Sequence, residues 1–278
     1  LAKPALLDDL VATLALAPRL AEILSRRPDL LEALVSGQAP EPPTITASTS
    51  FDAALDEWRR YHREQSFLIG HNLLHGLINA SDAAAHWSRL ADDTIRQMAE
   101  VAEAETVRRY GQPPGVWGVF AMGKLGGSEL TAGSDLDIIV VYEAPSLDSQ
   151  SWFTRVTQRL ITALTAPTAE GALYEVDMRL RPSGRGGPVA VSLTAFNSYQ
   201  NDEAWTWEHM ALTRLRFVSG DTGLGAKVLS SAKAAIAARA STDAGQIAQD
   251  VSEMRQRLYR EKPGKGLWDL KTEKGGLI

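Results

Sequence analysis

The chain has 278 residues, of which 44% are hydrophobic and 23% are charged, a composition typical of folded globular proteins. This length predicts about two domains. The net charge of −5 argues against a nucleic-acid-binding protein, because sequence-independent binding to nucleic acid needs a basic surface. The absence of cysteine excludes disulfides, thiolate metal sites and cysteine nucleophiles.

Neither a membrane span nor a signal segment is visible in the sequence. No apolar run approaches about 18 residues, and no charged-then-apolar segment opens the chain. The chain begins at Leu1 rather than at methionine and stops abruptly after a Lys-Gly-Gly-Leu-Ile end. We therefore expect a cytoplasmic piece of a longer protein that has no membrane partner.

Residues 1–112 predict a helical N-terminal region. Apolar residues recur at intervals of three and four between 6 and 34, with breaks at Pro18 and Pro28. A proline-rich linker is expected over 38–50. Further helices are predicted from about 51 to 79 and from about 82 to 111, where two prolines follow and end the pattern.

The pattern changes at residue 113 and predicts a sheet. The segments 116–122 and 136–142 are continuous apolar runs, which are typical of buried strands. A helix is predicted around 152–164, between the second and third strands. Helical patterns then return, and they include a helix from about 243 to 262. The order of elements predicts an α+β fold with a core over 113–220 and a helical tail over 221–278.

A third strand is predicted over 173–181, where polar and apolar residues alternate. Val176, Met178 and Leu180 would face the core. The opposite face would carry only charged side chains, those of Glu175, Asp177, Arg179 and Arg181.

Two aspartates open the second predicted strand directly after a glycine-rich turn. Asp135 and Asp137 are two residues apart, so on a strand they share one face, and Asp177 lies on the polar face of the third strand. Three such carboxylates suit Mg²⁺, and paired Mg²⁺ ions hold the attacking and leaving oxygens in phosphoryl or nucleotidyl transfer. Asp-x-Asp alone is more often a solvated strand start, so the combination carries the prediction.

Glycines and cations near these aspartates suit phosphate. The backbone amides of Gly126 and Gly127 could cradle a triphosphate, although such glycines are more often only turn formers. Arg179, Arg181 and Arg185 surround the next turn, where guanidinium groups either bind phosphate oxygens or form a salt-bridged strand edge. Weaker candidates for the same task are Lys124 and Lys271.

Other conspicuous residues are interpreted as packing. His71 and His75 have the i, i+4 spacing of a metal pair, but no third ligand accompanies them in the sequence. The residues Trp205, Trp207 and Met210 are expected to pack a helix, and the role of Glu208 beside them is left open.

The motif of a Gly-Gly-Ser, an Asp-x-Asp and a later strand aspartate resembles the DNA polymerase β-like nucleotidyltransferase superfamily. More narrowly, the strings over 122–137 (Met-Gly-Lys-Leu-Gly-Gly-Ser-Glu-Leu…Gly-Ser-Asp-Leu-Asp) and over 173–184 (Leu-Tyr-Glu-Val-Asp-Met-Arg-Leu-Arg-Pro-Ser-Gly) resemble the glutamine synthetase adenylyltransferase family. The likeness extends over most of the chain and includes the Lys-Thr-Glu-Lys-Gly-Gly-Leu string at 271–277.

The resemblance implies a polymerase β-like mixed sheet and a reaction that transfers AMP from ATP to a tyrosine of glutamine synthetase, with release of pyrophosphate. Asp135, Asp137 and Asp177 would hold Mg²⁺, with Asp177 also a candidate proton acceptor. The phosphates would be held by Gly126, Gly127, Ser128, Ser134, Arg179 and Arg181. The PII signalling protein and glutamine would be effectors, and the sequence identifies no site for either.

The family carries two related catalytic halves, one that attaches AMP and one that removes it by phosphorolysis with release of ADP. The string Glu-Ala-Trp-Thr-Trp-Glu-His at 203–209 resembles the attaching half. The removing half is the first alternative, and a non-catalytic nucleotide-binding regulatory module is the second. Because the family continues beyond the last residue with an acidic segment, the activity of this piece alone is left open.

Overall fold

The computed structural model describes residues 4–36, 40–46, 49–241, 244–261, 266 and 269. As predicted, helices form the N-terminal part: α1 (Pro4–Leu16), α2 (Pro18–Arg26), α3 (Leu30–Ser36), α4 (Phe51–Leu74) and α5 (Ala80–Tyr110). Ser50 and Asn79 cap the starts of α4 and α5, and Gly111 ends α5 with a φ of 82°. No helix within the described ranges is long and apolar enough to cross a membrane.

A mixed sheet follows, which confirms the predicted α+β class. Its strands are β1 (Val116–Ala121), β2 (Leu136–Glu143), β3 (Val176–Asp177), β4 (Ala190–Ser192) and β5 (Arg216–Gly220). The order is β3-β2-β1-β5, and β4 also pairs with β2. Strand β1 is antiparallel to both β2 and β5, whereas β3 and β4 run parallel to β2.

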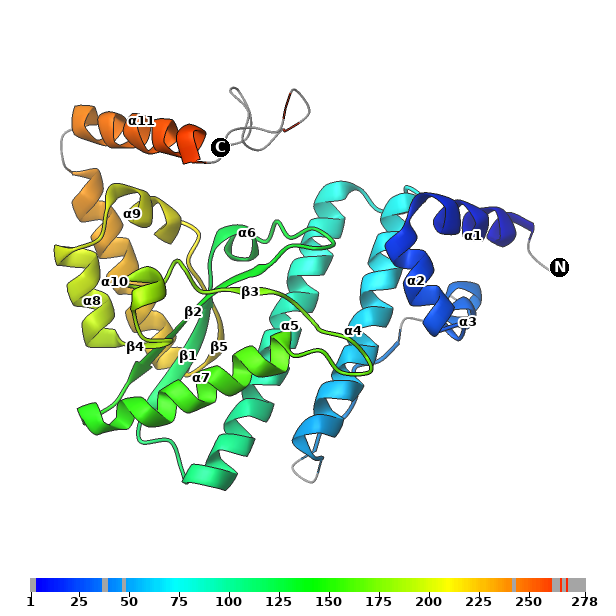
Figure 1. The fold of residues 1–278 in the computed structure, drawn as a ribbon, viewed down its shortest axis with the longest axis horizontal. Coiled ribbons are helices and arrows are strands. Elements are labelled where there is room, and N and C mark those ends of the chain that lie inside the picture. Colours follow the sequence, from blue (N-terminus) through cyan, green and yellow to red (C-terminus); the bar gives the residue numbers. More distant parts are fainter. Residues whose placement is uncertain are drawn as a thin grey trace.

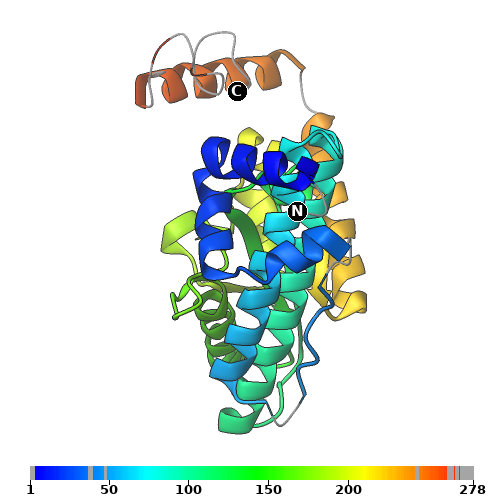
Figure 2. The same ribbon diagram turned by 90° about the vertical axis from the view of Figure 1, so that its right-hand side faces the viewer.

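Helices cover both faces of this sheet (Figure 1). The other helical elements are α6 (Gly123–Gly126), η1 (Leu147–Ser149), α7 (Gln150–Thr165), η2 (Gly184–Gly186), α8 (Leu193–Asp202), α9 (Thr206–Leu212), α10 (Thr222–Ala240) and α11 (Ala244–Glu261). Helices α5 and α7 pack on one face, and α8 and α10 pack on the other. Helices α1 to α3 lie against the hairpin of α4 and α5, and α11 lies beyond α9 at the edge of the fold (Figure 2).

The alternation of side chains along β2 separates two hydrophobic clusters. Ile138 and Val140 point toward α5 and α7, whereas Ile139 and Val141 point toward α8 and α10. The first cluster also contains residues of α4, so it continues across the predicted boundary between residues 112 and 113. The helical N-terminal region and the sheet therefore share one core, while their division into separate domains stays a prediction.

The third predicted strand is much shorter than expected. Strand β3 contains only Val176 and Asp177, because the backbone N–H of Arg179 turns back to the Asp177 carboxylate at 2.8 Å. The N–H of Arg181 then donates to the Met178 carbonyl at 3.2 Å, which continues the turn. The predicted common face of charged side chains beyond Asp177 is therefore wrong.

Met98 on α5 is fully buried in the cluster that joins the helices to the sheet. We expect Met98→Ala to lower the free energy of unfolding in urea by about 2–5 kcal/mol, because it leaves a cavity. Since the core is shared, amide hydrogen exchange should speed up in both α5 and β2. Faster exchange in α5 with an unchanged β2 would show instead that the helices unfold independently.

Candidate active site

The pairing of β2 with β3 brings two of the three predicted aspartates together. Asp137 and Asp177 are register partners in the parallel ladder. Asp137 alternates with Leu136 and Ile138, which face α5 and α7, so its carboxylate lies on the α8 and α10 side of the sheet. Val176 packs against the α5 and α7 cluster, which puts the Asp177 carboxylate on the same side as that of Asp137.

The glycine turn after β1 folds directly onto Asp137. The Met122 N–H donates to the Asp137 carbonyl at 2.8 Å. Gly123 has a φ of +53°, and a Cβ atom there would lie 2.2 Å from Asp137 Oδ2. Only glycine fits this position. The sequence analysis did not select Gly123, although its place between a buried strand and Lys124 was a usable signal.

Arg179 neutralises Asp177. Its Nε donates to Asp177 Oδ2 at 2.7 Å, and its Nη2 forms an ion pair with the same oxygen. These hydrogen bonds hold the pKa of the Asp177 carboxyl below its ordinary value, and the charge of Arg185 acts in the same direction. The predicted phosphate ligand Arg179 is thus the partner of the predicted metal ligand Asp177.

Asp135 is exposed and lies in the turn before β2. Ser134, which was predicted to bind nucleotide, instead closes this turn: its hydroxyl accepts the Thr131 N–H at 3.0 Å. Across the part of the chain that the structure describes, no three His, Cys, Asp or Glu residues form a group ready to hold a metal ion. The structure therefore makes Asp137 and Asp177 register partners, and the charges of both Asp137 and Asp135 act on Arg179 beside them.

The amide cradle expected at Gly126, Gly127 and Ser128 is not formed in this structure. Their N–H groups donate at 2.8, 3.2 and 3.1 Å to the carbonyls of Met122, which caps α6, and of Gly123 and Leu125 within that short helix. The glycine at 126 has a packing reason, because a Cβ atom there would lie 1.9 Å from the Arg214 carbonyl oxygen. Since these amides already have partners, the Ser128 hydroxyl is the group of this segment that we still propose as a phosphate ligand.

Arg216 and Arg214, which the sequence analysis did not select, hold this turn. Arg216 donates to the Leu125 carbonyl at 2.8 Å and to Asp92 of α5 at 2.7 and 2.9 Å. Arg214 donates to Glu129 at 2.6 Å. An arginine at the start of a strand gives no sign of such a role, so the signal was absent from the sequence.

Arg181 has a different role from the predicted one. It is only 9% exposed, and its guanidinium donates to the carbonyls of Met178 at 2.8 Å and Gly187 at 3.1 Å. Burial lowers its pKa. Arg181 therefore fixes the loop after Asp177 instead of facing a phosphate. The weaker candidate Lys271 lies outside the described residues.

The interpretation of the remaining residues is confirmed in part. His71 is buried, and the Thr13 hydroxyl of α1 lies 3.3 Å from its ring and 2.9 Å from that of His75, so this pair packs α1 on α4. The packing prediction is wrong for Trp205 and Met210, which are 66% and 50% exposed.

Glu208, whose role was left open, connects α8 with α9. Its carboxylate accepts the Tyr199 hydroxyl at 2.7 Å and the Trp205 N–H at 2.9 Å. Burial and this carboxylate raise the pKa of Tyr199 to about 12.

A mixed sheet with helices on both faces, an aspartate pair at one register position and a glycine turn folded onto it fit the α+β nucleotidyltransferase fold class. A family model described as glutamate-ammonia ligase adenylyltransferase matches residues 7–231. The chain belongs to this family.

Curated relatives agree with this family. The chain is 43%, 44% and 44% identical to proteins named bifunctional glutamine synthetase adenylyltransferase/adenylyl-removing enzyme from Mesorhizobium japonicum, Brucella suis and Caulobacter vibrioides. The alignments cover 99%, 99% and 100% of this chain. The chain spans 30% of the length of each of these relatives.

The ion pair of Asp177 with Arg179 predicts a pH-dependent stability. Because the folded-state pKa of Asp177 is lowered, its stabilising effect is complete above the unfolded value of about 3.9 and is lost as the pH falls through the folded value. We expect Arg179→Met to reduce the free energy of unfolding above about pH 4. Urea unfolding at successive pH values should show this difference shrinking below that pH. A difference that is constant down to the lowest pH would contradict the assignment.

Proposed function

We propose that this chain carries an adenylylating active site: it transfers AMP from ATP to a tyrosine of glutamine synthetase and releases pyrophosphate. The observation that carries this proposal is the register pairing of Asp137 with Asp177 beside the Gly123 turn. Family membership supplies the chemical class, and the likeness of the segment 203–209 to the attaching half favours the direction of transfer.

The acidic residues fit Mg²⁺. Carboxylate oxygens are the ligands that this ion prefers. Asp137 and Asp177 would supply them from neighbouring strands, and Asp135, two residues before Asp137, would supply the third carboxylate. The missing side chain at Gly123 lets the turn approach Asp137 Oδ2 closely. When bound, Mg²⁺ would neutralise the triphosphate and lower the pKa of the tyrosine hydroxyl.

The protein's own residues would then act on the two substrates. The tyrosine oxygen forms a bond with the α-phosphorus of ATP, the bond from that phosphorus to the bridging oxygen breaks, and pyrophosphate leaves. Asp177 would accept the hydrogen bond of the tyrosine hydroxyl. Its pKa is too low for it to keep a proton while Arg179 is its partner.

Arg179 has a side chain that is 57% exposed, so it is able to turn from Asp177 to the phosphates of ATP. This movement would raise the pKa of Asp177 and make it a better proton acceptor at the moment when ATP is bound. Arg185, which is exposed and acts electrostatically on Asp177, would be the second cation near the phosphates.

Control by the PII protein and by glutamine, and a cytoplasmic location, are part of the same proposal and rest on the family resemblance alone. Within the described residues, no feature identifies a binding site for either effector.

The direct test offers α-labelled ATP, Mg²⁺ and unmodified glutamine synthetase to the chain. We expect label on the synthetase, and we expect Asp135→Asn with Asp137→Asn to reduce it by about 100-fold or more. Asp148→Asn, which changes an exposed aspartate outside the site, is the matched control and should leave labelling unchanged.

Absence of label from a wild-type chain that still binds ATP would contradict the adenylylating assignment. Release of ADP from pre-adenylylated synthetase in the presence of phosphate would assign the chain to the removing half instead.

A further inference from the structure

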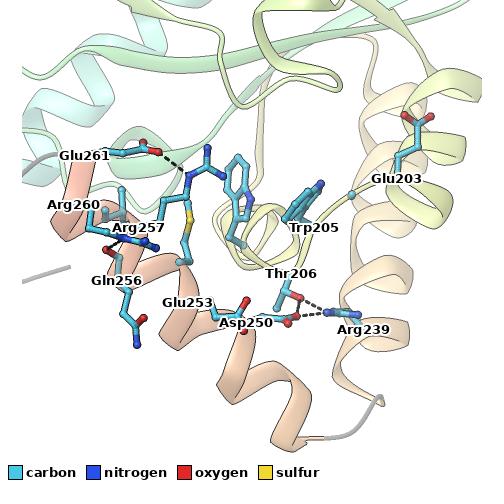
Figure 3. A pocket seen from close by; sticks show the side chains of 14 residues that line it. Glu203, Trp205, Thr206, Arg239, Asp250, Glu253, Gln256, Arg257, Arg260 and Glu261 are labelled. Carbon is cyan, nitrogen blue, oxygen red and sulfur yellow. Dashed lines mark hydrogen bonds and ion pairs between the residues drawn. The ribbon is translucent and has the colours of Figure 1, made fainter.

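A cavity of about 810 Å³ lies between α9 and α11 (Figure 3). Its α9 side contains Trp205 and Trp207, and its α11 side contains Met254, Arg257 and Leu258. Small-molecule sites usually have volumes of about 300–1,000 Å³ and combine apolar walls with a few polar groups. The cavity has the size and composition of a ligand site.

Trp205 is a large aromatic residue that is exposed in this cavity. It is 66% exposed and lines the cavity from the position directly before α9. Figure 3 shows it on the α9 side, with Arg257 and Glu261 on the α11 side. An exposed indole is a flat surface on which a nucleic-acid base stacks, and arginine contributes to such sites through its planar cation.

A polar cluster joins α9, α10 and α11 at one side of the cavity. Asp250 of α11 accepts hydrogen bonds from Thr206 of α9 and from Arg239 of α10, and Arg239 also contacts Thr206 (Figure 3). These contacts lower the pKa of Asp250, with the Thr206 hydroxyl as the main cause. Because α11 has no buried residue along its described length, this polar cluster is one of the contacts that join α11 to α9 and α10.

Hydrogen bonds connect the start of α9 at the cavity with α8, which packs on the side of the sheet that carries the aspartate pair. The Trp205 N–H donates to Glu208 at 2.9 Å, and Glu208 accepts the Tyr199 hydroxyl at 2.7 Å. The backbone of Ser183, in the loop that follows Asp177, lies near enough to Tyr199 to act on its pKa, in the lowering direction. Arg181 fixes the same loop from within. The backbone at Trp205 is therefore joined through Glu208 to Tyr199, which lies near the loop that presents Asp177.

We infer that this cavity is the nucleoside-binding part of the site and that the adenine of ATP stacks on Trp205. The inference rests on the proposed function, because it takes ATP as the substrate. It assigns the base to the cavity between α9 and α11 and the triphosphate to the side of Asp137, Asp177 and Arg179. Since stacking accepts every base, Trp205 supplies affinity and not discrimination between bases.

Calorimetric titration with ATP and with inorganic tripolyphosphate, each with Mg²⁺, tests this assignment. We expect Trp205→Ala to weaken ATP binding by about 10-fold, whereas Trp205→Phe keeps a ring and most of the affinity. Tripolyphosphate, which has no base, should bind both variants and the wild type equally. Met210→Ala is the matched control, because Met210 is also exposed on α9 but does not line the cavity.

Three results would overturn the inference while leaving the proposed function intact. The first is unchanged ATP affinity in Trp205→Ala. The second is an equal loss of ATP and tripolyphosphate affinity, which would mean that the substitution distorts the whole site. The third is an increased KM for glutamine synthetase with unchanged ATP binding, which would assign the cavity to the protein substrate. Failure of the wild-type chain to bind ATP would instead overturn the proposed function together with the inference.

Discussion

The candidate site depends on the register of β2. This strand contributes Ile138 and Val140 to one hydrophobic cluster and Ile139 and Val141 to the other, so both of its faces are buried. A shift of one residue would exchange these faces and carry the Asp137 carboxylate into the cluster beneath α5 and α7. Burying that carboxylate without a partner would be very unfavourable. Core packing therefore determines where the aspartates of the site lie.

Two arginines hold the backbone segments beside the aspartates in place. Arg216 joins the glycine turn to Asp92 of α5, and Arg181 holds the loop after Asp177 through backbone carbonyls. Both side chains hydrogen-bond to backbone carbonyls next to the aspartates. Their removal would therefore change the positions of the glycine turn and of the loop after Asp177. Arg179 differs from them, because it is more than half exposed and pairs with the carboxylate itself. Its exposure leaves its guanidinium able to contact other groups besides Asp177.

Much of the fold could be predicted from the sequence, because the decisive signals were local. The continuous apolar runs gave β1 and β2, and Gly111 marked the end of α5. The short β3 could not be predicted, since its end depends on the Arg179 N–H finding the Asp177 side chain.

Parts of the site could not be predicted from the sequence either. The N–H groups of Gly126 and Gly127 are used in hydrogen bonds of the short helix α6. Four residues are too few to show a helical period in the sequence, so this helix was not predicted. The cavity at Trp205 depends on a contact between Thr206 and Asp250, which are 44 positions apart. Exposure of Trp205 is a tertiary property, and its sequence context alone suggested packing.

The central claim is that Asp137 and Asp177 form a cation site and that Arg179 competes for it. The most direct measurement is Mn²⁺ binding to the free chain, followed by electron paramagnetic resonance, in wild type, Asp137→Asn, Asp177→Asn and Arg179→Met. We predict weaker binding in both asparagine variants and tighter binding in Arg179→Met. Equal Mn²⁺ affinity in all four proteins would contradict the claim.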